Sequence, residues 1–206
     1  RCSGTWWART TWRGPSGTSV SGEKDLPITW NEQRGILWKV PLPGTGTSTP
    51  AVWEDALFVT CLTPENKLLL VKFAKEDGKV VWQREVGSGE DTREGPRRSK
   101  LKVHQFYSIA SPSPVTDGKT VVTHFGNGDL AAYDFDGNPL WTRTFSQTSA
   151  NAVSVDDLGN VYVSGSTSAS LGALSAGGND IFVRKYDVAG DVLWTYQIGT
   201  PEYDWG

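Results

Sequence analysis

The chain has 206 residues, a formal net charge of −3 at pH 7 and 37% hydrophobic residues, with ten tryptophans and no methionine. This length can bury a sizeable core, and the acidic balance argues against a general nucleic-acid binder, which presents a basic surface to phosphates. No apolar run approaches the roughly 18 residues of a membrane span and no signal-peptide pattern opens the chain, so we expect no membrane span. Because the first residue is Arg1 and methionine is absent, we expect a processed form or a fragment.

The first segment, residues 1–35, is rich in tryptophan. Its Trp6, Trp7 and Trp12 are expected to pack over the first sheet, with stacking on sugar rings as the alternative. Cys2 and Cys61 form either one bridge or a tail thiol and a small buried hydrophobe, and we favour the second interpretation. Without a CxxC pair there is no zinc-ribbon or thioredoxin-like signal.

Short strands come next. The run GILWKV, which contains Trp38, is expected to be the outer strand of a sheet whose other strands are missing from this sequence. A first repeat unit follows, from about Thr47 to Val86. It has apolar or alternating runs typical of strands at Ala56–Cys61, Lys67–Phe73 and Val80–Val86, with a tight turn at Asp77-Gly78.

The second unit, from Ser111 to Thr144, shows the pattern most clearly. Its four strands are predicted at Ser113–Thr116, Thr120–Phe125, Leu130–Phe135 and Pro139–Thr144. The turns between them contain Asp117-Gly118, Gly126–Gly128 and Asp136–Asn138. Because glycine and asparagine adopt the positive φ that tight hairpins require, the unit should be a four-stranded antiparallel meander.

The third unit runs from about Ala150 to Ile198, with strands predicted at Val161–Gly165, Asp180–Asp187 and Asp191–Ile198. Each unit ends on a small-residue turn followed by a tryptophan, and the repeat spacing suits four-stranded units with inserts. We expect these indoles to pack between neighbouring units; they are Trp38, Trp82, Trp141 and Trp194. No window keeps a helical apolar periodicity, so the chain should be nearly all β.

Two parts of the sequence resemble known repeat families. Residues 12–145, which include ILWKVPLPG, STPAVW and DLAAYDFDGNPLW, resemble the PQQ-like (quinoprotein-like) β-propeller family of bacterial extracytoplasmic proteins. From about Ala150, the segment with GNVYVSG and DIFVRKYDVAGDVLW resembles the seven-bladed β-propeller (SBBP) repeat of secreted bacterial proteins. The resemblance implies a β-propeller of four-stranded antiparallel blades in a periplasmic or secreted protein. It divides the chain into the segment 1–35, PQQ-like blades at 36–145, and an SBBP-like blade with the start of another at 146–206.

The number of predicted units is too small to close a β-propeller ring. A propeller needs about four to eight blades, whereas the sequence shows three complete units, one N-terminal strand and a C-terminal stub. We therefore expect either an incomplete ring that is a fragment, which we favour, or a ring completed by self-association through open blade edges and faces.

The meander also predicts a functional face. In a four-stranded blade, the connections from second to third strand and from one blade to the next lie on one face. Both long inserts, Gly87–Gln105 and Ser166–Asn179, fall there, and long loops on a rigid scaffold are where binding residues accumulate. The first insert carries a basic cluster, Arg93, Arg97, Arg98, Lys100 and His104. Our hypothesis is that it binds a carboxylate or phosphate; the alternative is a solvated loop.

Several motifs resemble ligand loops but are better explained as turns. DGKT at Asp117–Thr120 lacks the upstream glycine of a phosphate loop, Gly126–Ala131 opens no helix as a dinucleotide site does, and Asp134–Asn138 lacks the downstream glutamate of an EF-hand. The only histidines are His104 and His124, without an HExxH or GxSxG motif. We predict no catalytic residue.

Some PQQ-like proteins bind the quinone beside an adjacent-cysteine disulfide and a calcium site. Cys2 and Cys61 are not adjacent and no calcium cluster is evident, so we expect no cofactor. The favoured function is a non-catalytic extracytoplasmic scaffold or binding module that takes a protein or glycan partner on its long-loop face. The alternative is a fragment of a PQQ-dependent quinoprotein oxidoreductase whose remaining blades hold PQQ and calcium.

Overall fold

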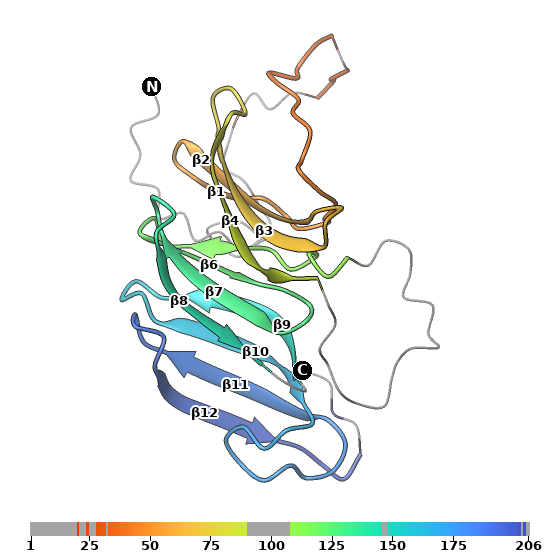
Figure 1. Ribbon diagram of the computed structural model, residues 1–206, viewed down its shortest axis with the longest axis vertical. Coiled ribbons are helices and arrows are strands. Elements are labelled where there is room, and N and C mark those ends of the chain that lie inside the picture. Colours follow the sequence, from red (N-terminus) through yellow and green to blue (C-terminus); the bar gives the residue numbers. More distant parts are fainter. Residues whose placement is uncertain are drawn as a thin grey trace.

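The computed structural model describes residues 20, 24, 28–31, 33–89, 108–145, 148–202 and 204. They form three four-stranded antiparallel sheets, each a meander of consecutive strands. Figure 1 shows the sheets one after another along the long axis of the molecule. The described residues contain no helix, and so none that has the length and apolar character to cross a membrane. The predicted all-β fold of four-stranded propeller blades is confirmed.

We call the sheets blade 1, blade 2 and blade 3. Blade 1 consists of β1 (Ala51–Trp53), β2 (Ala56–Leu62), β3 (Lys67–Ala74) and β4 (Val80–Ser88). Blade 2 consists of β5 (Val115–Thr116), β6 (Thr120–His124), β7 (Asp129–Asp134) and β8 (Pro139–Thr144). Blade 3 consists of β9 (Thr148–Val155), β10 (Val161–Thr167), β11 (Asp180–Tyr186) and β12 (Val192–Ile198). The strand ends lie close to those predicted from the turn residues.

The β7–β8 turn shows why the chain reverses where it does. Gly137 has a φ of 86°, which strongly favours glycine. The Asp134 carboxylate accepts hydrogen bonds of 2.7 Å from both the backbone N–H and the side-chain amide of Asn138. These bonds hold the pKa of the Asp134 carboxyl below its usual value and close the turn without help from other blades.

One predicted strand does not form. Residues 36–40, around Trp38, are irregular, and an isolated bridge between Thr45 and Leu62 joins this region to blade 1. A strand needs a neighbouring strand to pair its backbone groups, and within the described ranges none lies beside residues 36–40. The sequence pattern is compatible with a strand, but the described residues supply no strand that pairs with it.

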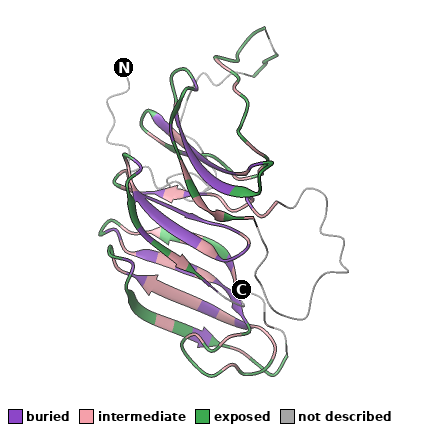
Figure 2. Ribbon diagram, in the orientation of Figure 1, coloured by how far each residue is buried: buried purple, intermediate pink, exposed green. Residues whose placement is uncertain are grey.

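The core lies between the blades. Phe58 and Leu70 of blade 1 pack with Val121 of blade 2, whereas Val122 of blade 2 packs with Phe182 of blade 3. Adjacent residues of β6 therefore serve different junctions, because side chains alternate along a strand. In Figure 2 the buried residues dominate the middle strands of blades 1 and 2, whereas β12 is largely exposed.

One contact is repeated at the junctions between blades. Trp82 of β4 lies against Gly137 in the β7–β8 turn, and Trp141 of β8 lies against Gly190 in the β11–β12 turn. A β-carbon added at Gly137 or Gly190 would approach the indole to 2.8 Å or 2.5 Å, so a larger residue would overlap the ring. Each indole thus connects the last strand of one blade to the last turn of the next.

The N-terminal segment makes the same contact with blade 1. Trp38 lies against Gly78 in the β3–β4 turn, and its indole N–H donates a hydrogen bond of 2.9 Å to the Lys75 carbonyl. Trp194 has the corresponding position on β12 but remains 44% exposed, because the described residues place no blade beyond blade 3.

Candidate functional site

The connections between strands divide the molecule into two faces. The long-loop face, as we call it, carries the loops 63–66, 125–128 and 168–179 between second and third strands, and the connections from β4 to β5 and from β8 to β9. The opposite face carries the remaining short turns, including those at Gly137 and Gly190. Among the described residues, the longest connection on the long-loop face is the loop 168–179 of blade 3.

The base of this loop is fixed by one glutamine. Gln197 of β12 is 8% exposed. Its side-chain oxygen accepts hydrogen bonds from the backbone N–H groups of Leu171, at 2.8 Å, and Gly172, at 3.1 Å. Its side-chain nitrogen donates to the Ala169 carbonyl at 3.0 Å and to the Asp180 carboxylate at 2.7 Å. All the hydrogen-bonding groups of this amide hold the loop, so Gln197 is a structural residue.

Two charged residues also hold the loop 168–179 in place. Asp180, 1% exposed at the start of β11, also accepts a hydrogen bond from the Ala176 N–H at 3.2 Å. Arg184 donates to the Leu171 carbonyl at 3.1 Å. In contrast, Leu174 at the tip of the loop is 88% exposed. A rigid base that presents an exposed apolar tip is suited to contact another macromolecule.

The blade 2 loop on this face is tied to blade 1. The Asn127 side chain is 3% exposed and donates to the Ser88 carbonyl at the end of β4, at 3.1 Å, and to the Asp129 carboxylate at 2.8 Å. The second oxygen of Asp129 accepts from the Thr144 hydroxyl at 3.0 Å. These bonds align the loops of neighbouring blades on one surface.

The basic cluster predicted as an anion-binding region lies outside the described residues. This applies to all of its members, Arg93, Arg97, Arg98, Lys100 and His104. The connection that carries them leaves β4 and enters β5 on the long-loop face. Their role as a ligand or partner loop stays a prediction.

Two residues with shifted pKa values lie between blades, not among the loops. Desolvation lowers the pKa of His124 to about 4; its ring is 3% exposed and neither ring nitrogen has a hydrogen-bond partner. Desolvation also lowers the pKa of Lys72, whose ammonium group donates to the Phe135 carbonyl at 2.8 Å. Both groups belong to blade junctions, so neither is placed to meet a substrate.

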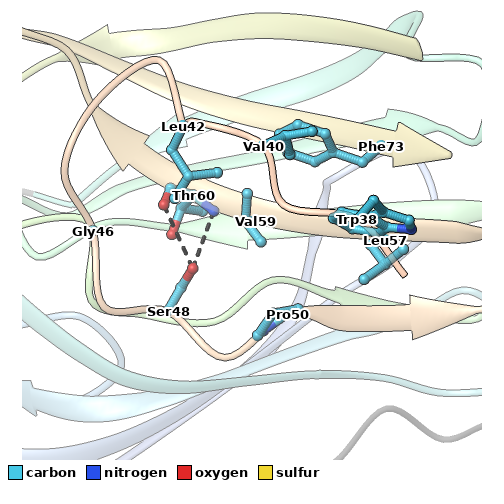
Figure 3. A pocket seen from close by; sticks show the side chains of 10 residues that line it. All are labelled: Trp38, Val40, Leu42, Gly46, Ser48, Pro50, Leu57, Val59, Thr60 and Phe73. Carbon is cyan, nitrogen blue, oxygen red and sulfur yellow. Dashed lines mark hydrogen bonds between the residues drawn. The ribbon is translucent and has the colours of Figure 1, made fainter. Parts of the chain in front are cut away.

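An apolar cavity of about 220 Å³ lies at the other end of the molecule, between blade 1 and the segment that precedes it (Figure 3). Trp38, Val40 and Phe73 form part of its wall. Its polar side chains are already hydrogen-bonded: the Ser48 hydroxyl accepts from the Thr60 N–H at 3.1 Å, the Thr60 hydroxyl donates to the Ala110 carbonyl at 3.1 Å, and the Trp38 N–H donates to the Lys75 carbonyl. No unpaired polar group of the described lining is available to orient a ligand, so we do not assign a site here.

The motifs that resemble ligand loops are turns in the structure. The Asp117 carboxylate accepts from the Thr120 N–H at 2.7 Å inside the β5–β6 turn, and the Asp134 oxygens are bonded to Asn138 as described above. Within the described ranges, no three His, Cys, Asp or Glu side chains gather in a way that would hold a metal ion.

The decisive comparison is with protein families. The PQQ_2 family model, described as "Outer membrane protein assembly factor BamB", matches residues 13–171 and, in a second match, residues 94–204. The chain belongs to the PQQ_2 family. It is therefore a PQQ-like β-propeller repeat protein, as the resemblance of residues 12–145 implied. The PQQ_2 match continues through the part that resembles the SBBP repeat, and that finer resemblance stays a prediction.

Three solved structures are similar to most of this chain. A europium-containing methanol dehydrogenase is 15% identical with a TM-score of 0.51, covering 75% of this chain and 25% of its own. BamB from Moraxella catarrhalis is 17% identical with a TM-score of 0.42, covering 78% and 51%. Quinohemoprotein alcohol dehydrogenase from Comamonas testosteroni is 14% identical with a TM-score of 0.49, covering 82% and 23%. The chain thus spans about a quarter of the two dehydrogenases and about half of BamB. At 15% identity, the similarity to the methanol dehydrogenase supports the fold of this chain and does not indicate an activity.

A comparison with curated proteins found no match.

A PQQ and calcium group does not fit the described residues. Cys61 is a free, fully buried thiol among Val59, Leu69 and Val71, and burial raises its pKa. Its side chain is enclosed by apolar neighbours within blade 1, and Cys2 is outside the described residues. With no metal-ligand cluster in these ranges, we derive no chemistry through this cofactor.

Proposed function

We propose that this PQQ_2 propeller is a non-catalytic, extracytoplasmic scaffold that binds a protein partner through its long-loop face, with a glycan as the second ligand class. The observation that carries the proposal is the loop 168–179, in which Gln197 and Asp180 fix the base while Leu174 is exposed at the tip. The name of the family model, an assembly factor for outer membrane proteins, supports a protein partner and an extracytoplasmic place of action.

Site-specific photo-crosslinking tests the proposal. A photoreactive amino acid is placed at position 174 and, as a matched control, at position 188. Leu174 and Val188 are exposed aliphatic residues of blade 3, on the long-loop face and the opposite face respectively. In a bacterial envelope extract we expect a discrete protein adduct from position 174 and none from position 188. Equal adducts from both positions would contradict a partner site on the long-loop face, and glycan binding without any protein adduct would favour the second ligand class.

The oxidoreductase alternative has a separate test. We expect the chain, supplied with PQQ, calcium and a primary alcohol, to reduce a redox dye no faster than a mixture without protein, because the described residues contain no cluster of metal ligands and Cys61 is a free thiol. Dye reduction that requires the chain, PQQ and calcium together would show that the remaining residues carry quinoprotein chemistry.

A further inference from the structure

The last strand of blade 3 has a free edge. β12 lies at the end of its sheet and pairs with β11 alone. In the turn between the two strands, the Asp187 N–H donates to the Asp191 carbonyl at 2.9 Å, so the backbone groups of alternate β11 residues from there point toward β12. These residues pair with Trp194, Tyr196 and Ile198. The backbone groups of Thr195 and Gln197 therefore point away from β11, to the free edge.

This strand lacks the charges and the proline that protect the equivalent edges of the other blades. The last strand of blade 1 carries Arg84 and Glu85, and that of blade 2 begins with Pro139 and carries Arg143. Charged residues and proline on an edge strand oppose pairing with a further strand. β12 reads VLWTYQI and has neither. An uncharged run of β-branched and aromatic residues is prone to pair edge to edge with another chain.

The loop 168–179 covers this edge instead. Gly172 lies against Thr195, where an added β-carbon would approach the outward-facing carbonyl oxygen to 2.8 Å and the side-chain methyl group to 2.7 Å. The backbone N–H groups of Leu171 and Gly172 donate to the side chain of Gln197, the next outward-facing residue. Gln197 is consequently buried although it belongs to an edge strand. The loop therefore occupies the place that an incoming strand would need.

Among the three described blades, only blade 3 has such a long loop. The corresponding loops of blades 1 and 2 span only residues 63–66 and 125–128. In those two blades the edge strand carries its own charges, whereas in blade 3 the edge strand is uncharged and the loop is long. A covering loop and charged residues are alternative ways to protect a sheet edge, and this chain uses one or the other in each blade.

We propose that the loop 168–179 is a strap that shields the β12 edge and prevents two copies of the chain from pairing through it. When the strap is displaced, the β12 strand of a second copy pairs with the edge in antiparallel orientation. The sequence suits this occupant, because a pair centred on Thr195 places Trp194 opposite Tyr196 of the second copy, which is a stabilising aromatic cross-strand pair. This role belongs to the base of the loop and is independent of a partner bound at its tip.

A bulkier residue at position 172 tests the strap. Gly172→Val overlaps Thr195 and should displace the strap, whereas Gly126→Val is the matched control, because a β-carbon there meets its neighbours at an ordinary distance of 3.5 Å. Sedimentation velocity should show the parent chain and the control as monomers at about 100 µM, and self-association of Gly172→Val that is at least about tenfold tighter. Circular dichroism checks that the sheets remain folded. Gly172→Ala, which adds only the β-carbon, should associate more weakly than Gly172→Val, and it replaces that variant in the test if the valine prevents folding.

A charge placed on the edge separates loss of the strap from general instability. Tyr196 is 61% exposed and lies two residues after the tryptophan of its strand, the position of Arg84 in β4 and Arg143 in β8. Tyr196→Arg, added to the Gly172 variant, should therefore restore the monomer. Val188→Arg, at an exposed position in the β11–β12 turn, should not restore it.

Three results would overturn the proposal. The folded Gly172 variant could remain monomeric, which would show that the strap is not needed to protect the edge. The parent chain could associate as tightly as the variant. Finally, Tyr196→Arg could fail to restore the monomer, or Val188→Arg could restore it equally well, and either result would show that association does not use the β12 edge.

Discussion

Replacing Trp141 by alanine is expected to lower the free energy of unfolding by about 3–5 kcal/mol, the usual cost of truncating a buried aromatic side chain. Trp141 is 7% exposed. Its ring stacks on Tyr186 of blade 3, with centroids 5.7 Å apart and an interplanar angle of 28°, and it covers Gly190. The substitution would therefore leave a cavity between blades 2 and 3 that neither sheet can fill alone. Urea denaturation followed by circular dichroism measures the loss.

Trp194→Ala is the matched control for this prediction. Trp194 has the corresponding strand position, but its ring is 44% exposed and contacts residues of its own blade. We expect it to cost only about 1 kcal/mol in the parent chain. Equal losses for the two variants would show that these indoles stabilise their own sheets and not the junctions between blades.

Lowering the pH from 8 to 5 is expected to reduce the free energy of unfolding by about 2 kcal/mol through His124 alone. The imidazole has a pKa of about 4 in the folded chain, against 6.5 when it is solvated. The unfolded chain therefore binds a proton in a pH range where the folded chain does not. The stabilisation is complete above pH 6.5 and is lost as the pH falls toward 4. Urea denaturation at several pH values between 5 and 8 measures it.

His124→Leu is the control variant. An apolar side chain of similar size removes two buried nitrogens that have no partner, which is expected to be neutral or stabilising at pH 8. At pH 5 the variant should be more stable than the parent by about 2 kcal/mol, with a nearly flat dependence on pH. If the variant and the parent lose stability equally, another group is responsible. Asp134 titrates below this pH window, because hydrogen bonds from Asn138 lower the pKa of its carboxyl group.

The turn residues carried most of the information that was readable from the sequence. The four strands of blade 2 were predicted close to their observed bounds, since Gly118, Gly128 and Gly137 mark chain reversals and have positive φ in the structure. Such signals are local and need no knowledge of the rest of the fold. Residues 36–40 around Trp38 do not form the predicted strand, because a strand also needs a pairing partner, and the sequence had already indicated that the other strands of that sheet are missing.

The sequence predicted which face carries the long loops, but not which residues hold those loops in place. Loop length and strand order placed the inserts on one face, but nothing distinguished Gln197 from any other polar residue of a strand. Its role depends on Leu171 and Asp180, which are distant in sequence. The burial of His124 was also unforeseen. Blades on both sides cover β6, so side chains on both of its faces are buried, and His124 is among them.

The proton chemical shifts of three glycines test blade stacking most directly. An indole face lies against the α-carbons of Gly78, Gly137 and Gly190, so their Hα resonances should be shifted upfield by the ring currents. Gly159, which also has a positive φ but lies against the aliphatic Val188 side chain, is the control and should show an ordinary shift. Ordinary shifts at Gly137 and Gly190 would contradict the packing of one blade's indole on the next blade's turn, and an ordinary shift at Gly78 would contradict the contact of Trp38 with blade 1.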